Sequence, residues 1–465
     1  MKRNNFLGII ILLSITGTSV LQEKLYAQGQ DDHPLTISGE LFTDERVLTD
    51  GGDWAWNETR LSLRLDRQVS GNSKFHSEIW LRNMGLPGIT SSKDLYNKGI
   101  IDPYNLEIRE AYVRINGFLT GKLDLTIGRQ RIAWGTADKL NPTDNLNPYD
   151  MEDILDFGRH RGSDAISLDY YFFNDFSFQV VFIPFFQPAN MPVGIFSEVL
   201  NPQMELPPGL TLAGLSDTVL LPRFDLVESS VAGFRFKGFV GGIDFSLSYT
   251  RGMDGLPVNT KNIFIPLDTM GNIRINSELS FARTNIFGAD LATSLRGMGF
   301  WAEGALFLPG KDVIMTTDLT ALYPMSPVPV LQDSLILDSS KPYLKFITGT
   351  DYFFGNGSYI HLQYMHGFMH ERGSENLNDY FFLRFEKKFY NDRLKLAPLG
   401  GGFILTDWKD IKNNYAVVYM PEIAYNATDN AEISLSASIF KGRGDNLFAQ
   451  LKDLNMLIFK LKYSF

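Results

Sequence analysis

The sequence predicts an all-β chain that closes into an antiparallel transmembrane β-barrel. Three observations support this fold class. Apolar and polar residues alternate along almost the whole chain, short and long connections follow one another, and the final segment is an amphipathic strand that runs to the last residue. Beyond the N-terminal region, no stretch approaches the ~20 apolar residues that a transmembrane helix needs.

The alternation has a period of two, which is the period of a β-strand. In residues 60–66 the leucines share one face and the charged residues share the other, and residues 243–250 and 433–439 repeat the pattern. A soluble β-sandwich also alternates. The densely charged polar face of the first strands and the aromatic residues near strand ends favour a barrel with a charged lumen and a lipid-facing outer wall. The charged residues are Glu58, Arg60, Arg64, Asp66, Glu78, Arg82, Glu110 and Arg114.

The connections set the strand count. Short turns are expected at eight places, residues 70–72, 117–121, 173–175, 240–242, 295–299, 355–357, 391–393 and 428–430. Long connections are expected at nine places, residues 45–55, 85–104, 135–162, 185–228, 252–282, 309–340, 370–378, 406–413 and 442–450. Strict alternation gives about 18 strands, with both termini on the short-turn side. Barrels of this kind have short periplasmic turns and long extracellular loops. Residues 273–281 read either as an extra strand or as an extension above the membrane, and a count of 16 stays open.

The closing strand carries Leu457, Phe459, Leu461, Tyr463 and Phe465 on one face. We expect that face to meet lipid and the strand to pair with the one that starts near Leu35. Lys460 and Lys462 should then point into the lumen near its periplasmic exit. A terminal aromatic on such a strand resembles the C-terminal signature of bacterial outer-membrane barrels. This resemblance implies that the barrel-assembly machinery recognises the strand that ends at Phe465.

The N-terminal residues have the features of a secretory signal. Lys2 and Arg3 precede a short apolar run at residues 6–13, which is too short to span a bilayer. We expect a signal peptide at residues 1–27 and a single barrel domain at residues 28–465, because no linker or charge run divides the rest. The alternative is an N-terminal membrane anchor.

Composition excludes several classes of function. The chain has no cysteine, so disulfides, thiol catalysis and thiolate metal sites are excluded. A net charge of −10 argues against a nucleic-acid partner. His361, His366 and His370 lie close together in the sequence, but neither a Gly-x-Ser-x-Gly nor a His-Glu-x-x-His motif is present. We therefore expect neither an enzyme nor a cofactor.

The connection at residues 135–162 is the best candidate for a constriction. It contains two Asn-Pro pairs, which fix extended or turn geometry. It also contains Asp144, Asp150, Asp153 and Asp156. Folded inward, it would oppose a basic ladder of Arg60, Arg64, Arg82 and Arg114, which Glu58, Glu78 and Glu110 would partly neutralise. Opposed acidic and basic walls create a transverse field across a pore. The alternative is that these aspartates cap turns and stay solvated.

Two further connections, residues 185–228 and 309–340, are unusually apolar. Solvated loops have no reason to be apolar. They would plug or cover the extracellular mouth, bind an apolar ligand, or simply pack against each other.

Residues 128–135 read Gly-Arg-Gln-Arg-Ile-Ala-Trp-Gly, and Asp138 and the Asn-Pro-Thr-Asp and Asn-Pro-Tyr-Asp segments follow. This strand-plus-loop pattern resembles a family of porin-like outer-membrane proteins over residues 120–165, and the end of the signal region resembles those of Bacteroidetes. The resemblance implies that Arg129 and Arg131 line the pore. Strand parity puts both on the apolar face unless Gly128 is a bulge that turns them inward; otherwise they lie in the headgroup zone.

Together these features predict a porin-like channel for the passive diffusion of small solutes through a loop-constricted lumen. The alternative is a non-conducting barrel that transports lipid or hydrophobic compounds, or serves as a partner in an envelope complex. Expected partners are outer-membrane lipid and small solutes. An oligomer is compatible with the sequence.

Overall fold

A computed structural model describes residues 34–465, except residues 86–87, 174, 198, 200–205 and 207. The predicted signal peptide lies outside the described residues. The wall strands are β1 (Thr36–Leu48), β2 (Trp54–Ser70), β3 (Ser73–Met84), β4 (Tyr104–Ile115), β5 (Leu123–Gln130), β6 (Ser163–Phe173), β7 (Phe176–Ile183), β9 (Val231–Val240), β10 (Ile243–Met253), β13 (Arg283–Leu295), β14 (Met298–Pro309), β17 (Tyr343–Phe353), β18 (Ser358–His366), β19 (Asp379–Phe389), β20 (Leu394–Leu405), β21 (Tyr415–Tyr419), β22 (Glu422–Thr428), β23 (Ala431–Arg443) and β24 (Met456–Ser464).

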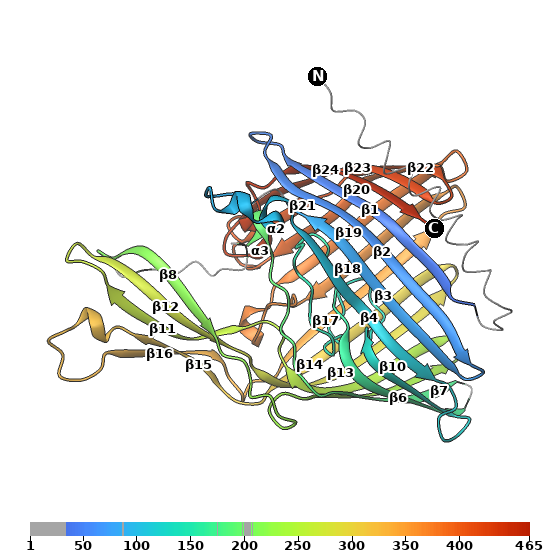
Figure 1. The fold of residues 1–465 in the computed structure, drawn as a ribbon, viewed down its shortest axis with the longest axis horizontal. Coiled ribbons are helices and arrows are strands. Elements are labelled where there is room, and N and C mark those ends of the chain that lie inside the picture. The colour runs from blue at the N-terminus through green and yellow to red at the C-terminus, as the bar shows by residue number, and fades with distance from the viewer. Residues whose placement is uncertain (1–33, 86–87, 174, 198, 200–205, 207) are drawn as a thin grey trace.

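These strands form a closed antiparallel barrel of 18 strands (Figure 1). Each wall strand pairs with its neighbours along the chain, and β1 pairs with β24 to close the wall. β21 and β22 are two halves of one strand, because both lie between β20 and β23 and only Met420 and Pro421 separate them. The predicted fold class and the count of 18 are therefore confirmed.

The predicted turns join the strand pairs at one end of the barrel. All eight are found between the expected strands, although Asn174 in the third lies outside the described residues. The turn between β9 and β10 shows why the sequence signal is strong. Gly241 and Gly242 both adopt positive φ, at 61° and 86°, and tight hairpin turns require such angles. The nine long connections lie at the opposite end, which we call the long-loop end.

Three long connections build a second sheet beyond the barrel wall (Figure 1). Its strands, in spatial order, are β16 (Leu331–Leu337), β15 (Val313–Asp318), β11 (Val258–Pro266), β12 (Asn272–Ser280) and β8 (Thr211–Val219). Residues 273–281 are thus an extension above the wall and not a wall strand. Phe264, Ile273 and Ile275 form the buried core of this sheet, against Leu210 and Leu319 of the two apolar connections. Part of the apolar content of those connections therefore packs between loops, whereas other apolar side chains stay exposed, among them Leu215 (61%), Val227 (75%) and Met325 (96%).

The helices are short. They are η1 (Asp94–Tyr96), α2 (Lys98–Ile101), η2 (Gly194–Phe196), η3 (Thr320–Leu322), η4 (Ser374–Asn376) and α3 (Leu447–Gln450). Among the described residues, none of the helices has the length and apolar character that crossing a membrane requires.

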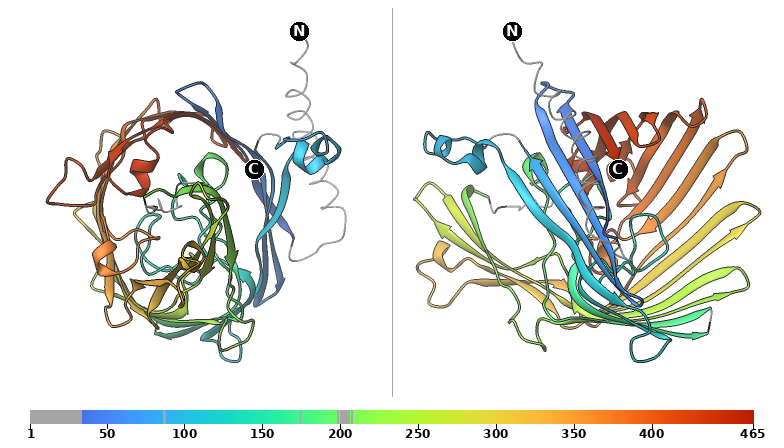
Figure 2. Two further views of the ribbon diagram at one scale, coloured as in Figure 1. Left: turned by 90° about the vertical axis from the view of Figure 1, so that its left-hand side faces the viewer. Right: turned by 45° about the vertical axis from the view of Figure 1, so that its right-hand side comes forward.

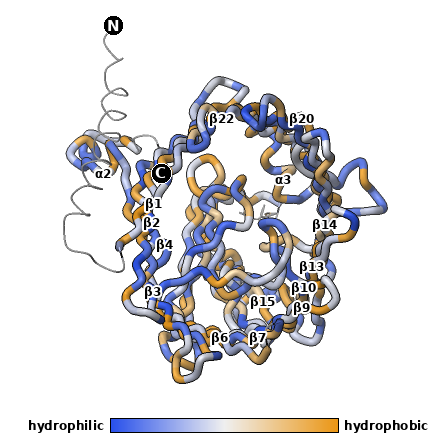
Figure 3. The backbone as a smooth tube through the Cα atoms, turned by 90° about the vertical axis from the view of Figure 1, so that its right-hand side faces the viewer, coloured by the Kyte–Doolittle hydropathy of each residue, from blue (hydrophilic) through white to orange (hydrophobic). Residues whose placement is uncertain are grey.

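The two faces of the wall differ as the alternation predicts, and Figure 3 shows apolar and polar residues alternating around the ring. On β24, Leu457 is 52% exposed and Phe459 is 42% exposed on the outer side. On the inner side, the Lys462 ammonium lies 2.9 Å from Glu40, and the Lys460 ammonium lies 3.3 Å from Asp44. The main chain of Phe465 exchanges hydrogen bonds with that of Gly39, at 2.9 and 3.0 Å.

Candidate functional site: a loop clamped inside the barrel

The connection between β5 and β6 turns back into the barrel, where Figure 2 shows loop segments inside the ring of strands. It contacts opposite walls. Asp153 pairs with Arg46 on β1, and Thr143 donates to Glu303 on β14. Residues 135–162 therefore cross the interior as an inward loop.

The base of the inward loop is held by one asparagine. The Asn147 side-chain amide donates to the Gln130 carbonyl at 3.1 Å and to Ser163 Oγ at 3.0 Å. Its oxygen accepts the Ile132 N–H at 2.7 Å. Asn147 thus ties the end of β5 to the start of β6, and the proline that follows continues the turn.

The first charged clamp joins the inward loop to β1. The Arg46 Nη1 donates to Asp153 Oδ1 at 2.8 Å, and Arg46 Nε donates to Asp44 Oδ1 at 3.0 Å. All three side chains are buried. Burial by itself raises the pKa of Asp153, but the facing Arg46 guanidinium outweighs it and lowers the pKa below the usual value.

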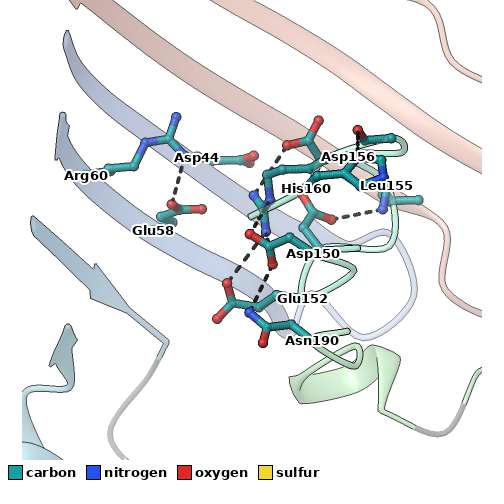
Figure 4. A network of polar contacts seen from close by, with 12 residues as sticks. Asp44, Glu58, Arg60, Asp150, Glu152, Leu155, Asp156, His160 and Asn190 are labelled. Carbon is teal, nitrogen blue, oxygen red and sulfur yellow. Dashed lines mark hydrogen bonds and ion pairs between the residues drawn. The ribbon is translucent and has the colours of Figure 1, made fainter. Parts of the chain in front are cut away.

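The second clamp centres on Asp150, and Figure 4 shows it together with the neighbouring acids. Asp150 Oδ2 lies 2.8 Å from Arg109 Nη1 and 3.1 Å from Arg159 Nε. Burial raises the pKa of Asp150, but the charges of Arg159 and Arg109 overcome this effect and lower the pKa to about 2. This carboxylate therefore stays ionised although it is buried.

Arg109 reaches the interior because β4 contains a bulge. In the β3–β4 ladder, Glu78 pairs with Glu110 and Ile79 pairs with Ile108, so Arg109 is the extra residue. A bulge allows two consecutive side chains to share one face. Arg109 and Glu110 consequently both point inward.

The third clamp is Arg82 on β3. Its Nη1 lies 2.7 Å from Glu152 of the inward loop and 2.8 Å from Glu107 of β4, and its Nε lies 3.3 Å from Glu58. Burial is the largest cause that raises the pKa of Glu152, and the nearby Arg82 opposes it.

The far side of the inward loop is held by Glu303, a lone carboxylate on an apolar strand. It accepts hydrogen bonds from Thr143 N at 2.8 Å, Thr143 Oγ1 at 2.7 Å, Thr136 N at 3.0 Å and Asn141 Nδ2 at 3.0 Å. Gly135 (φ 96°) passes so close that a Cβ there would lie 2.4 Å from Glu303 Oε2. Only glycine fits this crossing point.

The structure brings together only part of the predicted site. Asp153 and Asp150 lie in the first and second clamps, where they pair with Arg46 and Arg109, and Asp144 pairs with Arg131 just beyond β5. The Asp156 side chain pairs with Arg159 and is 46% exposed. Of the four arginines of the predicted ladder, only Arg82 contacts the inward loop.

The other ladder residues pair with neighbouring residues of the wall. Arg60 lies 3.4 Å from Glu58 and 4.2 Å from the Trp80 ring centre. Arg64 lies 3.0 Å from Glu78. Arg114 pairs with Asp124 at 2.7 Å, and Glu110 lies 3.8 Å from His76.

Arg129 and Arg131 differ in direction. The β5 ladder has no register shift at Gly128, so Arg129, which is opposite Asp164 in the ladder with β6, lies on the same face as the exposed Ile127. Arg129 therefore follows the outer-face alternative of the sequence analysis. Arg131 lies just beyond the strand, where the chain turns inward, and it pairs with Asp144.

Sequence reasoning missed several residues of the clamps. Glu303 is the only charged residue in its strand, so its isolation was a readable signal. Asp44 and Arg46 gave a weaker signal, because the charged Glu45 lies between them and breaks the alternation of β1. The role of Arg109 was hidden, because a strict period of two places it on the outer face.

Two of the three clustered histidines of the sequence have separate partners. His361 stacks on Trp301 with ring centres 5.3 Å apart, whereas His366 bonds to Asp379 at 2.8 Å. Within the described part of the chain, no group of three or more His, Cys, Asp or Glu residues could hold a metal ion.

No protein-family model and no curated protein sequence matches the chain. Solved structures that align with it include OmpF of Salmonella typhi in complex with daunomycin, with TM-score 0.42 and 9% identity over 94% of this chain and 99% of that one. OmpT of Vibrio cholerae aligns with TM-score 0.41 and 8% identity over 94% of this chain and 99% of that one. Its loop L8 deletion mutant aligns with TM-score 0.41 and 10% identity, over 94% and 100% of the two chains. At this identity the similarity concerns the fold alone.

Proposed function

We propose that the protein is a porin-like channel of a bacterial outer membrane, through which small solutes diffuse passively. The observation that carries the proposal is the inward loop, which is clamped to both walls of an 18-strand barrel. A barrel of this size has room for a water-filled lumen, and a fixed inward segment gives it a constriction. The predicted signal peptide and recognition of Phe465 by the assembly machinery belong to the same proposal.

The clamps change the expected electrostatics of the constriction. Because Asp144, Asp150 and Asp153 are paired directly with arginines, they oppose little free charge across the lumen. Charges that remain partly exposed on the inner wall include Arg64, Lys460 and Lys462, whose side chains are 58%, 38% and 49% exposed. We therefore assign ion selectivity to the wall toward the short-turn end and constriction to the inward loop.

A second candidate function rests on a different observation. Phe157, Phe368 and Phe448, from three connections, have ring centres 5.4–5.9 Å apart within a hydrophobic cluster at the long-loop end. Such packing inside a barrel is typical of a plugged mouth. It favours a non-conducting barrel that handles lipid or hydrophobic compounds, or serves as a partner in an envelope complex.

Conductance separates the two functions. Purified protein reconstituted in a planar bilayer should give stable ohmic steps with measurable ion selectivity. A silent barrel that copurifies with lipid or protein would refute the channel and support the plugged barrel.

A further inference from the structure

The outer wall of the barrel contains an apolar groove of about 590 Å³ across β14 and β17–β21. Its sides are formed by exposed apolar side chains of adjacent strands, which include Leu362 (45% exposed), Leu383 (38%) and Leu399 (48%). These residues belong to the outer face, because Gln363, next to Leu362 on β18, is buried, as is Val418 between the exposed Val417 and Tyr419 on β21. A volume of several hundred cubic ångströms is typical of small-molecule sites.

Small residues create this hollow. One cross-strand row runs from Thr350 through Leu362 and Leu383 to Gly401 and Tyr419. Gly401 has φ 127°, and a Cβ there would lie 1.9 Å from the Val418 carbonyl oxygen. No larger residue fits, so the outer face lacks a side chain at this point.

The groove also coincides with a break in the wall ladder. β20 pairs with β21 through residues 401–405 and with β22 through residues 394–397, and the stretch between them contains Pro398. Proline removes a ladder donor and is avoided in central strands. The Met420 N–H still bonds to the Gly400 carbonyl at 2.7 Å, so the wall stays linked while its outer surface is recessed.

A cluster of hydrogen-bonded polar side chains around Asp379, here called the Asp379 knot, lies at the long-loop end of the groove. Asp379 accepts hydrogen bonds from Tyr364 Oη at 2.7 Å and Trp408 Nε1 at 2.5 Å, and His366 Nδ1 lies 2.8 Å away. Tyr364 also lines the groove, and Trp408 is 60% exposed. Tyrosine and tryptophan concentrate where a membrane surface begins, so the knot marks the headgroup level and the groove lies at hydrocarbon depth.

We propose that this groove is a binding site for an acyl chain of a membrane lipid, with the lipid head at the Asp379 knot. At hydrocarbon depth the medium is lipid, and an apolar recess beneath an amphipathic rim fits a single chain. A second copy related by a two-fold axis fits less well, because a two-fold interface brings the same surface to both partners and two hollows leave a void between them. The inference depends on the membrane location of the barrel and not on conduction.

The test is native mass spectrometry of the full-length mature protein in detergent, with a dioleoyl phospholipid added as the probe. Thr348 lies in the groove, and its Oγ1 bonds only to the Trp301 carbonyl, at 3.1 Å. Thr348→Phe should fill the groove and weaken lipid retention by about tenfold or more, because apolar contact is lost. Thr348→Val keeps the volume and should retain the lipid, as should Thr59→Phe on the outer face of β2.

Folding of each variant is checked by the heat-dependent shift of its band on a denaturing gel, and conductance of the same preparations reports channel function separately. Equal lipid retention by wild type and Thr348→Phe would overturn the proposal. So would a wild-type dimer or higher oligomer that Thr348→Phe dissociates, because another copy of the chain would then occupy the groove.

Discussion

At the scale of single residues, the ion pairs between loop and wall fall into buried and exposed classes. Arg46 and Asp153 have side chains 1% and 7% exposed, whereas Asp156 is 46% exposed. Removing one partner of a buried pair leaves a buried charge and costs about 3–5 kcal/mol, whereas exposed pairs contribute about 0–1 kcal/mol. The inward loop is therefore held by few residues.

Asp153→Asn should lower the free energy of unfolding by about 3 kcal/mol, because Arg46 would keep only Asp44 as a partner. Asp156→Asn is the matched control and should change it by less than about 1 kcal/mol. Urea titration of the folded band on a denaturing gel measures both. Equal effects of the two substitutions would show that burial does not set the strength of the clamp.

The low pKa of Asp150 makes a prediction about acid. The folded-state pKa is about 2, against an ordinary value of 3.8, so the carboxylate contributes stability that is complete above about pH 4 and is lost as pH falls toward 2. That contribution corresponds to about 2 kcal/mol. When the pH is lowered from 5 to 2, protease cleavage of the inward loop should increase in the wild-type protein. Asp150→Asn should show high cleavage already at pH 5, and a wild-type profile in this variant would contradict the assignment.

Arg60 and Arg64 form their ion pairs with carboxylates of the inner wall and not with the inward loop, and the Arg64 side chain is 58% exposed, so we expect their charges to act on ions in the lumen. The double variant Arg60→Ala, Arg64→Ala should shift selectivity toward cations, because it removes two positive charges beside Glu58 and Glu78. Reversal potentials under a salt gradient measure this. Arg129→Ala, on the outer face, is the control and should leave the reversal potential unchanged. An unchanged reversal potential in the double variant would refute the role of Arg60 and Arg64 in ion selectivity.

At the scale of elements, the turns and strands were readable because their signals are local. Gly241 and Gly242 specify a hairpin by backbone angles alone. The sheet beyond the wall was not readable, because β8 pairs in parallel with β12 across a long stretch of chain and no local pattern encodes that partnership. The bulge at Arg109 was hidden for the same reason, since only pairing with β3 reveals it.

The inward loop as an element should control the size of the lumen. Replacing residues 138–157 with a short Gly-Ser linker removes Asp144, Asp150 and Asp153 together with the segment that carries them. Single-channel conductance should rise severalfold while the wall stays closed, because wall pairing does not use these residues. The gel shift is the control for folding, and unchanged conductance would show that the constriction lies elsewhere.

At the scale of the whole molecule, closure depends on the last strand. Deleting residues 456–465 would leave β1 and β23 each with an unpaired edge. Unsatisfied backbone groups in hydrocarbon cost several kcal/mol each, so we expect no folded, heat-shifting band from this variant. Phe465→Ala keeps the ladder and should still fold. A stable truncated barrel would mean that β1 and β23 can pair directly.

The seam that closes the barrel, where β1 pairs with β24 and Gly39 bonds to Phe465, has a kinetic consequence. Its two strands come from opposite ends of the chain, so this contact has the largest sequence separation in the wall. Long-range pairing is slow because the entropy of ordering the intervening chain must be lost first. Seam formation is therefore the expected rate-limiting step, and until it occurs both edge strands are open templates for pairing with a neighbouring chain. Slow closure thus makes the concentration of unfinished chains, rather than native stability, the quantity that limits the yield of folded protein.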